Sequence, residues 1–144
     1  MTDREAAAKD WLNRHEPIRN DIRALELQLE EMRANVNKTV ASLQEVKVQT
    51  PPQNKQAEKI AEIVDFGKKI EEKKNYLREL DQVTLNTINL MNDPYKRIIL
   101  VYRYIYHRSW SYIASKLHYK ESYIYEMHLK ALNSIYPLID FTAD

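Results

Sequence analysis

Basic and tyrosine side chains gather in the last third of the chain, where they could contact nucleic acid. Nine of the ten tyrosines follow Asp93, and residues 96–130 carry seven Lys or Arg against two Asp or Glu. Residues 1–92 are balanced, with 15 basic and 16 acidic side chains. Lysine and arginine bind phosphates, and tyrosine can donate to phosphates or touch thymine methyls. The local excess of positive charge therefore predicts a phosphate-binding surface in residues 93–144.

The sequence from Trp110 to Leu129 has the spacing of a helix-turn-helix motif. Small Ala114 lies where two helices must nearly touch. Apolar contacts on either side of a break at 118–120 are expected from Ile113, Leu117, Tyr119, Ile124 and Met127. We expect helices over about 94–107, 110–117 and 121–136, with a turn at 107–109. Ser109 or Ser111 can cap the middle helix, and Pro137 limits the last one.

In this motif the early residues of the second helix face base edges, and neighbouring basic residues reach phosphates. The candidate DNA-binding residues are Lys120, Glu121, Ser122, Tyr125, Glu126, Lys130, Arg108 and Lys116. Further phosphate candidates are Lys96, Arg97 and Arg103. Glu121 and Glu126 could accept from cytosine amino groups, or they could indicate that this face meets a protein. His118 occupies a turn position that is often glycine, because φ is positive there.

The residue types that support catalysis are not arranged for it. The chain has no cysteine and no H-E-x-x-H pair, and His107, His118 and His128 are spaced eleven and ten residues apart. A zinc site is therefore not expected, and His128 is interpreted as a core or surface residue. Phosphate-binding loops and nucleophile elbows are absent from the sequence, and the acidic residues of the N-terminal region spread around a solvated face. We expect no catalytic residue, no metal, no cofactor and no enzymatic activity.

The elements that would position these residues are helices. A single glycine in 144 residues argues against β-hairpin turns and most α/β folds. No apolar run is long enough to span a bilayer, and the N-terminus lacks the pattern of a secretory signal. These features predict an all-α protein that does not enter a membrane and works in the cytoplasm.

Residues 1–92 show the heptad spacing of a helical hairpin or coiled coil. Apolar residues recur at alternating spacings of four and three, interrupted only by Thr39, at Ile18, Ile22, Leu25, Leu29, Met32, Val36, Leu43 and Val46. We expect antiparallel helices over about 10–48 and 54–92, joined by a proline turn at 49–53. A second domain, 93–144, would hold the helix-turn-helix. Gly67 is expected to permit a close helix approach or a bend.

The two expected helices leave part of each apolar face open. A homo-oligomer formed through the hairpin is therefore expected, with the number of chains left open. The hairpin could pack within one chain or between two chains.

Three segments resemble the region-four domain of sigma factors of the sigma-seventy class: LNTINLMNDPYKRIILVYRYI (85–105), SWSYIASKL (109–117) and IYEMHLKAL (124–132). They look closer still to small phage-encoded, sigma-like transcriptional regulators related to the RinA and ArpU late-gene activators. The segment VKVQTPPQN (46–54) resembles the linker of such proteins. The resemblance implies binding of duplex DNA at a promoter, with host RNA polymerase as a candidate partner. It carries over as DNA-contacting Lys120, Glu121, Ser122, Tyr125, Glu126 and Lys130.

Two other classes of protein fit the same pattern. A small terminase-like subunit for DNA packaging also joins a helix-turn-helix to an oligomerising helical region, and it would form a ring of many subunits. An interaction or inhibitor protein would use the same fold to bind another protein instead of DNA. Glu121 and Glu126 are the best support for this last class.

Overall fold

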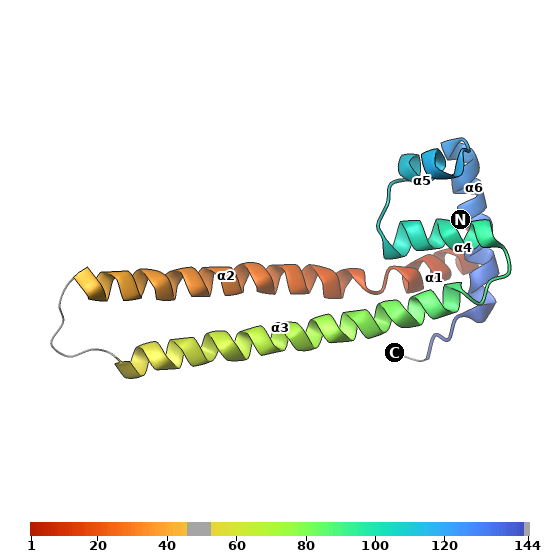
Figure 1. Ribbon diagram of the computed structural model, residues 1–144. Coiled ribbons are helices and arrows are strands. Elements are labelled where there is room, and N and C mark those ends of the chain that lie inside the picture. Colours follow the sequence, from red (N-terminus) through yellow and green to blue (C-terminus); the bar gives the residue numbers. More distant parts are fainter. Residues whose placement is uncertain (46–52, 143–144) are drawn as a thin grey trace. The chain divides into compact units, whose positions relative to one another are not determined.

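The computed structural model describes residues 1–45 and 53–142, and every regular element among them is helical (Figure 1). These elements are α1 (Asp3–Leu12), α2 (Glu16–Glu45), α3 (Gln53–Ile88), α4 (Pro94–Leu100), the π-helical turn η1 (Val101–Ile105), α5 (Trp110–Leu117), α6 (Glu121–Ile135) and the 3₁₀ turn η2 (Tyr136–Leu138). The predicted all-α class is confirmed. The predicted proline turn at 49–53 falls, except for Gln53, outside the described residues.

The chain divides into two compact units, and the division differs from the predicted boundary at residue 92. One unit combines Met1–Glu16 with Arg78–Asp144, and the other is Pro17–Leu77. The N-terminal residues and the last turns of α3 thus belong with the C-terminal helices. Heptad periodicity could not show this, because it reveals that a helix has an apolar face but not which partner covers that face.

A separate first helix, α1, stands where the sequence predicts the start of one long helix. Thr2 caps it, accepting a hydrogen bond of 3.2 Å from the Glu5 backbone N–H. The helix ends at Leu12, and a short turn precedes Glu16, where the Glu16 N–H donates to the Asn13 carbonyl at 2.9 Å. Pro17 has no backbone N–H, but it lies in the first turn of α2, where an N–H group would have no acceptor within the helix.

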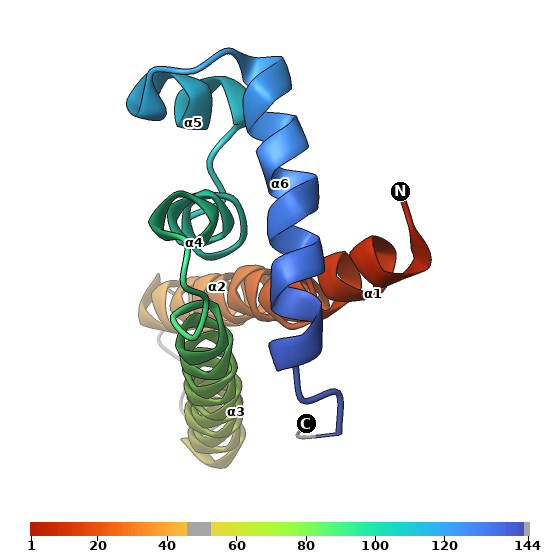
Figure 2. The ribbon, with the colours of Figure 1, turned by 90° about the vertical axis from the view of Figure 1, so that its right-hand side faces the viewer.

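The core of the first unit forms where α1, the end of α3 and α4 pack on α6. Its buried residues are Ala8, Trp11, Leu12, Ile88, Met91, Leu100, Tyr104, Ala131, Leu132, Ile135 and Ile139. Figure 2 shows α6 running beside α4 and α5, with α1 across its far end. Two polar contacts hold α1 in place: Arg14 donates to the Thr84 hydroxyl at 2.9 Å, and Asn133 donates to the Glu5 carboxylate at 3.0 Å.

The second unit is an antiparallel hairpin of α2 and α3. The two helices run in opposite directions (Figure 1), and two ion pairs join them, with Lys73 Nζ 2.7 Å from Asp21 and Lys74 Nζ 2.7 Å from Glu26. Its core consists of Ile22, Leu29 and Ile70, with Ile18, Leu25, Ile63, Phe66 and Leu77 partly buried around them. The first part of the predicted seam is therefore found at the contact between the helices.

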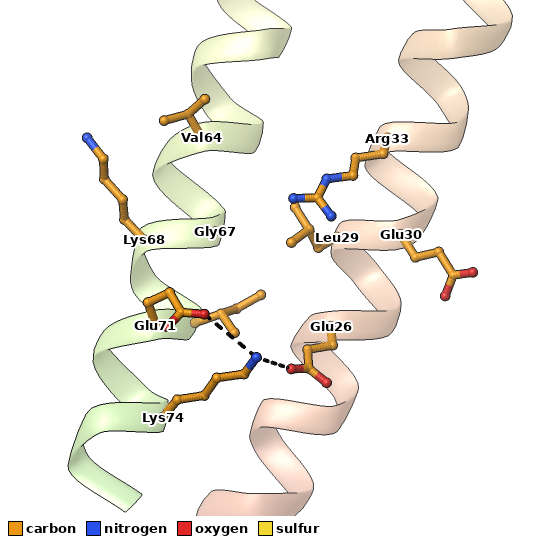
Figure 3. A pocket seen from close by; sticks show the side chains of 10 residues that line it. Glu26, Leu29, Glu30, Arg33, Val64, Gly67, Lys68, Glu71 and Lys74 are labelled. Carbon is orange, nitrogen blue, oxygen red and sulfur yellow. Dashed lines mark ion pairs between the residues drawn. The ribbon is translucent and has the colours of Figure 1, made fainter. Parts of the chain in front are cut away.

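Gly67 does not mark a close helix approach. It lies on a groove between α2 and α3 whose rim carries charged side chains such as Arg33 and Lys68 (Figure 3). A Cβ atom added at Gly67 would meet nothing within 4 Å, and the residue is helical with no positive φ. Of the two expectations for this glycine, a close helix approach or a bend, the close approach is wrong, because the apolar contacts of the hairpin pass beside it.

Candidate nucleic-acid interface

Two side-chain caps fix where α4 and α5 begin. Asp93 accepts hydrogen bonds from the N–H groups of Tyr95 (2.9 Å) and Lys96 (3.3 Å), and Pro94 fills the first turn of α4. Ser109 accepts from the Tyr112 N–H at 3.1 Å and starts α5. Asp93 is thus the cap of α4, and Ser109, one of the two serines expected to cap the middle helix, is the cap of α5.

The connection between α5 and α6 turns through a left-handed residue. His118 has φ 61° and ψ 42°, directly after the last residue of α5. A side chain other than glycine costs about 1 kcal/mol or more in this conformation. The expectation that the turn demands positive φ at this position is confirmed, and a histidine meets it.

A small apolar cluster holds α5 against α6 and α4. Ile99, Ile113 and Ile124 are fully buried, and Ala114 is nearly so. Tyr102, Trp110, Leu117 and Met127 pack around them. Of the five residues expected to supply these contacts, only Tyr119 does not: its side chain is 42% exposed.

All eight candidate DNA-binding residues are exposed. Arg108 lies in the turn before α5, Lys116 in the last turn of α5 and Lys120 at the N-cap of α6. The others lie along α6: Glu121, Ser122, Tyr125, Glu126 and Lys130.

Five of the eight candidate residues form two subsets. Arg108 and Lys116 both lie over the ring of Tyr112, at 4.9 Å and 5.5 Å from its centroid. Ser122, Glu126 and Lys130 follow one another at four-residue spacing, so they share one stripe of α6. The opposite stripe is buried and includes Ile124, His128, Ala131 and Ile135.

Glu121, in the first turn of α6, also has a structural role, since a negative charge there stabilises the helix N-terminus.

All three of the further phosphate candidates are engaged within the protein. Arg97 donates to the carbonyls of Met91 (2.8 Å) and Asn92 (3.2 Å), just after α3. Lys96 donates to the Ser134 hydroxyl at 3.1 Å. Arg103 donates to the Arg108 carbonyl at 3.1 Å and lies 4.3 Å from the Trp110 ring centroid. These three side chains therefore stabilise the fold, which leaves Arg108, Lys116, Lys120 and Lys130 as the exposed basic residues among the candidates.

A buried polar pair lies behind the exposed surface. The Tyr104 hydroxyl and His128 Nε2 share a hydrogen bond of 2.6 Å, and Trp110 packs edge-on against the imidazole at 4.6 Å. Burial lowers the pKa of His128 from its ordinary value of 6.5 to about 4, and the positive charges of Lys9 and Arg103 add to this effect. Burial likewise raises the pKa of the Tyr104 hydroxyl. His128 is therefore a neutral core residue, one of the two readings given from the sequence.

Three exposed tyrosines form a cluster that sequence reasoning did not assign. Tyr119 lies 4.8 Å from Tyr123 and 6.2 Å from Tyr95 between ring centroids. Their exposed fractions are 42%, 43% and 48%. The tyrosine-rich composition was the only signal for such a surface, because the three residues come from α4, the turn and α6.

Comparison with protein-family models, with curated proteins and with solved structures finds no match to this chain. None of the described helices is long and apolar enough to cross a membrane.

Proposed function

We propose that this chain is a phage-type transcriptional regulator that binds duplex DNA through α5 and α6. The observation that carries the proposal is the exposure of all eight candidate residues around a helix pair joined by a tight left-handed turn. Host RNA polymerase is the candidate protein partner, and the bacterial cytoplasm the place of action. No catalytic step is part of this function.

The proposed division of labour follows from the chemistry of each position. Ser122 and Glu126, in the N-terminal half of α6, would face base edges in the major groove. Lys130, further along the same stripe, would reach a phosphate. Arg108 and Lys116 would hold phosphates and set the register of the protein on DNA. Their common support on Tyr112 favours this role, since a cation over an aromatic ring keeps its charge exposed while its position is restrained.

The first test is selection of fragments from the genome that encodes this chain, at about 150 mM salt with non-specific competitor. Retention of one promoter-proximal fragment would support a sequence-specific regulator. Retention of no fragment, or of all fragments equally, would contradict the proposal.

Substitution of single lysines then tests the assigned face. Lys120→Ala and Lys130→Ala should each weaken binding about fivefold near 150 mM salt, and each should flatten the slope of log K against log salt by about one. Lys59→Ala removes the same charge from an exposed position on α3 and serves as the control. Unchanged affinity and slope in both test variants would show that α6 is not the DNA-binding face.

A protein-binding function is the second candidate, and the cluster of Tyr95, Tyr119 and Tyr123 favours it. Tyrosine is enriched in protein interfaces because its large ring and its hydroxyl both make contacts at low entropic cost. If the chain acts by binding a protein, the double substitution Tyr119→Ala and Tyr123→Ala should abolish capture of purified host RNA polymerase. DNA retention in the same variant distinguishes a separate protein-binding surface from a shared one.

A further inference from the structure

Two histidines and a glutamate from distant parts of the sequence come together in the first unit. His15 lies in the turn between α1 and α2, Glu16 is the first residue of α2, and His107 lies in the turn before α5. His107 Nδ1 is 3.2 Å from Glu16 Oε1, and His15 Nε2 is 3.4 Å from the same oxygen. One ligand atom from each of the three residues lies within 4.8 Å of the other two.

These separations are close to those around a tetrahedral zinc ion. Zinc–nitrogen and zinc–oxygen bonds of about 2.0–2.2 Å place neighbouring ligand atoms roughly 3.3 Å apart. Both measured distances to Glu16 match this value. The two imidazole nitrogens, which lie within 4.8 Å of each other, would need to close by no more than about 1.5 Å to share one ion.

The cluster is buried on the side of His15 and reaches solvent on the side of His107 and Glu16. The His15 side chain is fully buried, whereas those of His107 and Glu16 are 30% and 40% exposed. A cavity of about 330 Å³ adjoins it, and Glu16 and His107 are among the residues that line it. Lys9 and Arg103 line the same cavity. A fourth ligand could therefore enter from solvent, and the nearby positive charges favour water or an anion in that position.

The backbone at His107 places its side chain at the cluster. Its φ of 55° is left-handed, and His118 is the only other non-glycine residue with positive φ in the described ranges. The following residue is fixed by a hydrogen bond of 2.8 Å from the Arg108 N–H to the Tyr102 carbonyl, on the π-helical turn η1. The His107 ring then lies 5.1 Å from the His15 ring. An imidazole is held here in a conformation that glycine would adopt at lower cost.

We propose that His15, Glu16 and His107 bind a divalent transition-metal ion of the zinc type. Two imidazoles and one carboxylate suit zinc, cobalt or ferrous iron, whereas magnesium and calcium prefer ligand sets made of oxygen alone. The ion connects the turn between α1 and α2 to the turn before α5. It therefore restrains the segment that leads into the α5–α6 helix pair. This site goes beyond the proposed DNA binding and does not depend on it.

The test is metal binding by the purified full-length chain after removal of metals with a chelator. Co²⁺ is titrated in and followed by its visible absorption, and Zn²⁺ is titrated in and followed by calorimetry. We expect one Zn²⁺ per chain and displacement of bound Co²⁺ by Zn²⁺, but no displacement by Mg²⁺. His107→Asn should weaken Zn²⁺ binding by at least about tenfold, because one imidazole ligand is lost.

His118→Asn is the matched control. It makes the same chemical change at the other left-handed histidine, and asparagine tolerates this backbone conformation well. Glu16→Gln gives a second test at a partly exposed position, and circular dichroism checks that each variant keeps the native helix content. Absence of saturable Zn²⁺ binding by the folded native chain, or equal affinity in the native, His107→Asn and Glu16→Gln proteins, would overturn the proposal.

Discussion

His128 is a titratable side chain whose charge the fold suppresses. It is fully buried, it shares a hydrogen bond with Tyr104, and Lys9 and Arg103 add positive charge nearby, against a smaller opposing effect of Glu5. Its pKa is therefore lower in the folded state than in the unfolded chain. Protons bind the unfolded chain more readily, so acid should favour unfolding.

The sign and size of this effect can be predicted. The contribution of His128 to stability is complete above its unfolded pKa of 6.5, and it is lost as the pH falls toward the folded value of about 4. The full loss amounts to about 3 kcal/mol, of which about 2 kcal/mol should be lost by pH ~5. Urea unfolding between neutral pH and pH ~5 measures it. His128→Gln, which keeps an acceptor for Tyr104, should lack this part of the pH dependence. If the unfolding free energy changes equally with pH in both proteins, the lowered pKa of His128 is contradicted.

At the scale of residues, the sequence was informative where function depends on neighbours in the chain. The Asp93 and Ser109 caps and the left-handed residue at 118 follow from local hydrogen bonding and backbone sterics. The roles of Arg97 and Arg103 do not follow from local chemistry, because the carbonyls that accept their hydrogen bonds are placed by the ends of other elements. Composition suggested phosphate contacts for both, and tertiary structure engages them internally.

At the scale of elements, the periodic pattern located the helices, and the outcome varied with what each helix packs against. The bounds of α5 agree with the prediction and those of α6 differ by one residue, since turn residues delimit both. The expected helix at 94–107 instead changes to a π-helical turn after Leu100 and ends at Ile105. A π turn has no distinct side-chain pattern, so sequence periodicity gave no sign of it.

Gly67 permits a prediction at the scale of the helix. Replacing it with alanine should stabilise α3 by about 1 kcal/mol, because glycine is a poor helix former and the added methyl group meets no neighbour. Chemical denaturation of native and Gly67→Ala proteins, followed by circular dichroism, measures the change. Ala57→Gly on the same helix should produce a shift of opposite sign. Destabilisation by Gly67→Ala would mean that the groove closes on this position in solution.

At the scale of the whole molecule, the all-α class and the antiparallel hairpin could be read from composition and heptads. The membership of the two units could not. Trp11 and Leu12 lie outside the heptad seam, and only the folded chain shows that they pack with residues such as Leu132, far away in the sequence. Non-local burial of this kind leaves no periodic signal.

The mass of the particle in solution distinguishes the proposed regulator from a DNA-packaging subunit. A regulator should scatter light as one or two chains of 17.2 kDa, whereas a packaging subunit should form a ring of many. Ile60 and Val64 are about half exposed on α3 and lie one helical turn apart, so they are the expected contact in a dimer. Val64→Lys should then yield monomers, and Val83→Lys, an equally large change at a similarly exposed position of α3, should not. A mass of many chains would contradict the regulator.

Both tryptophans of the chain, Trp11 and Trp110, lie in the unit formed by Met1–Glu16 and Arg78–Asp144. Indole emission therefore reports on that unit alone. The far-ultraviolet circular dichroism of the chain measures helix content, and most of that signal comes from the long helices α2 and α3. Two optical signals from the unlabelled chain thus follow different parts of it. If the two melting curves do not superimpose, the units unfold in separate steps, and the free energy of each can be obtained without cutting the chain.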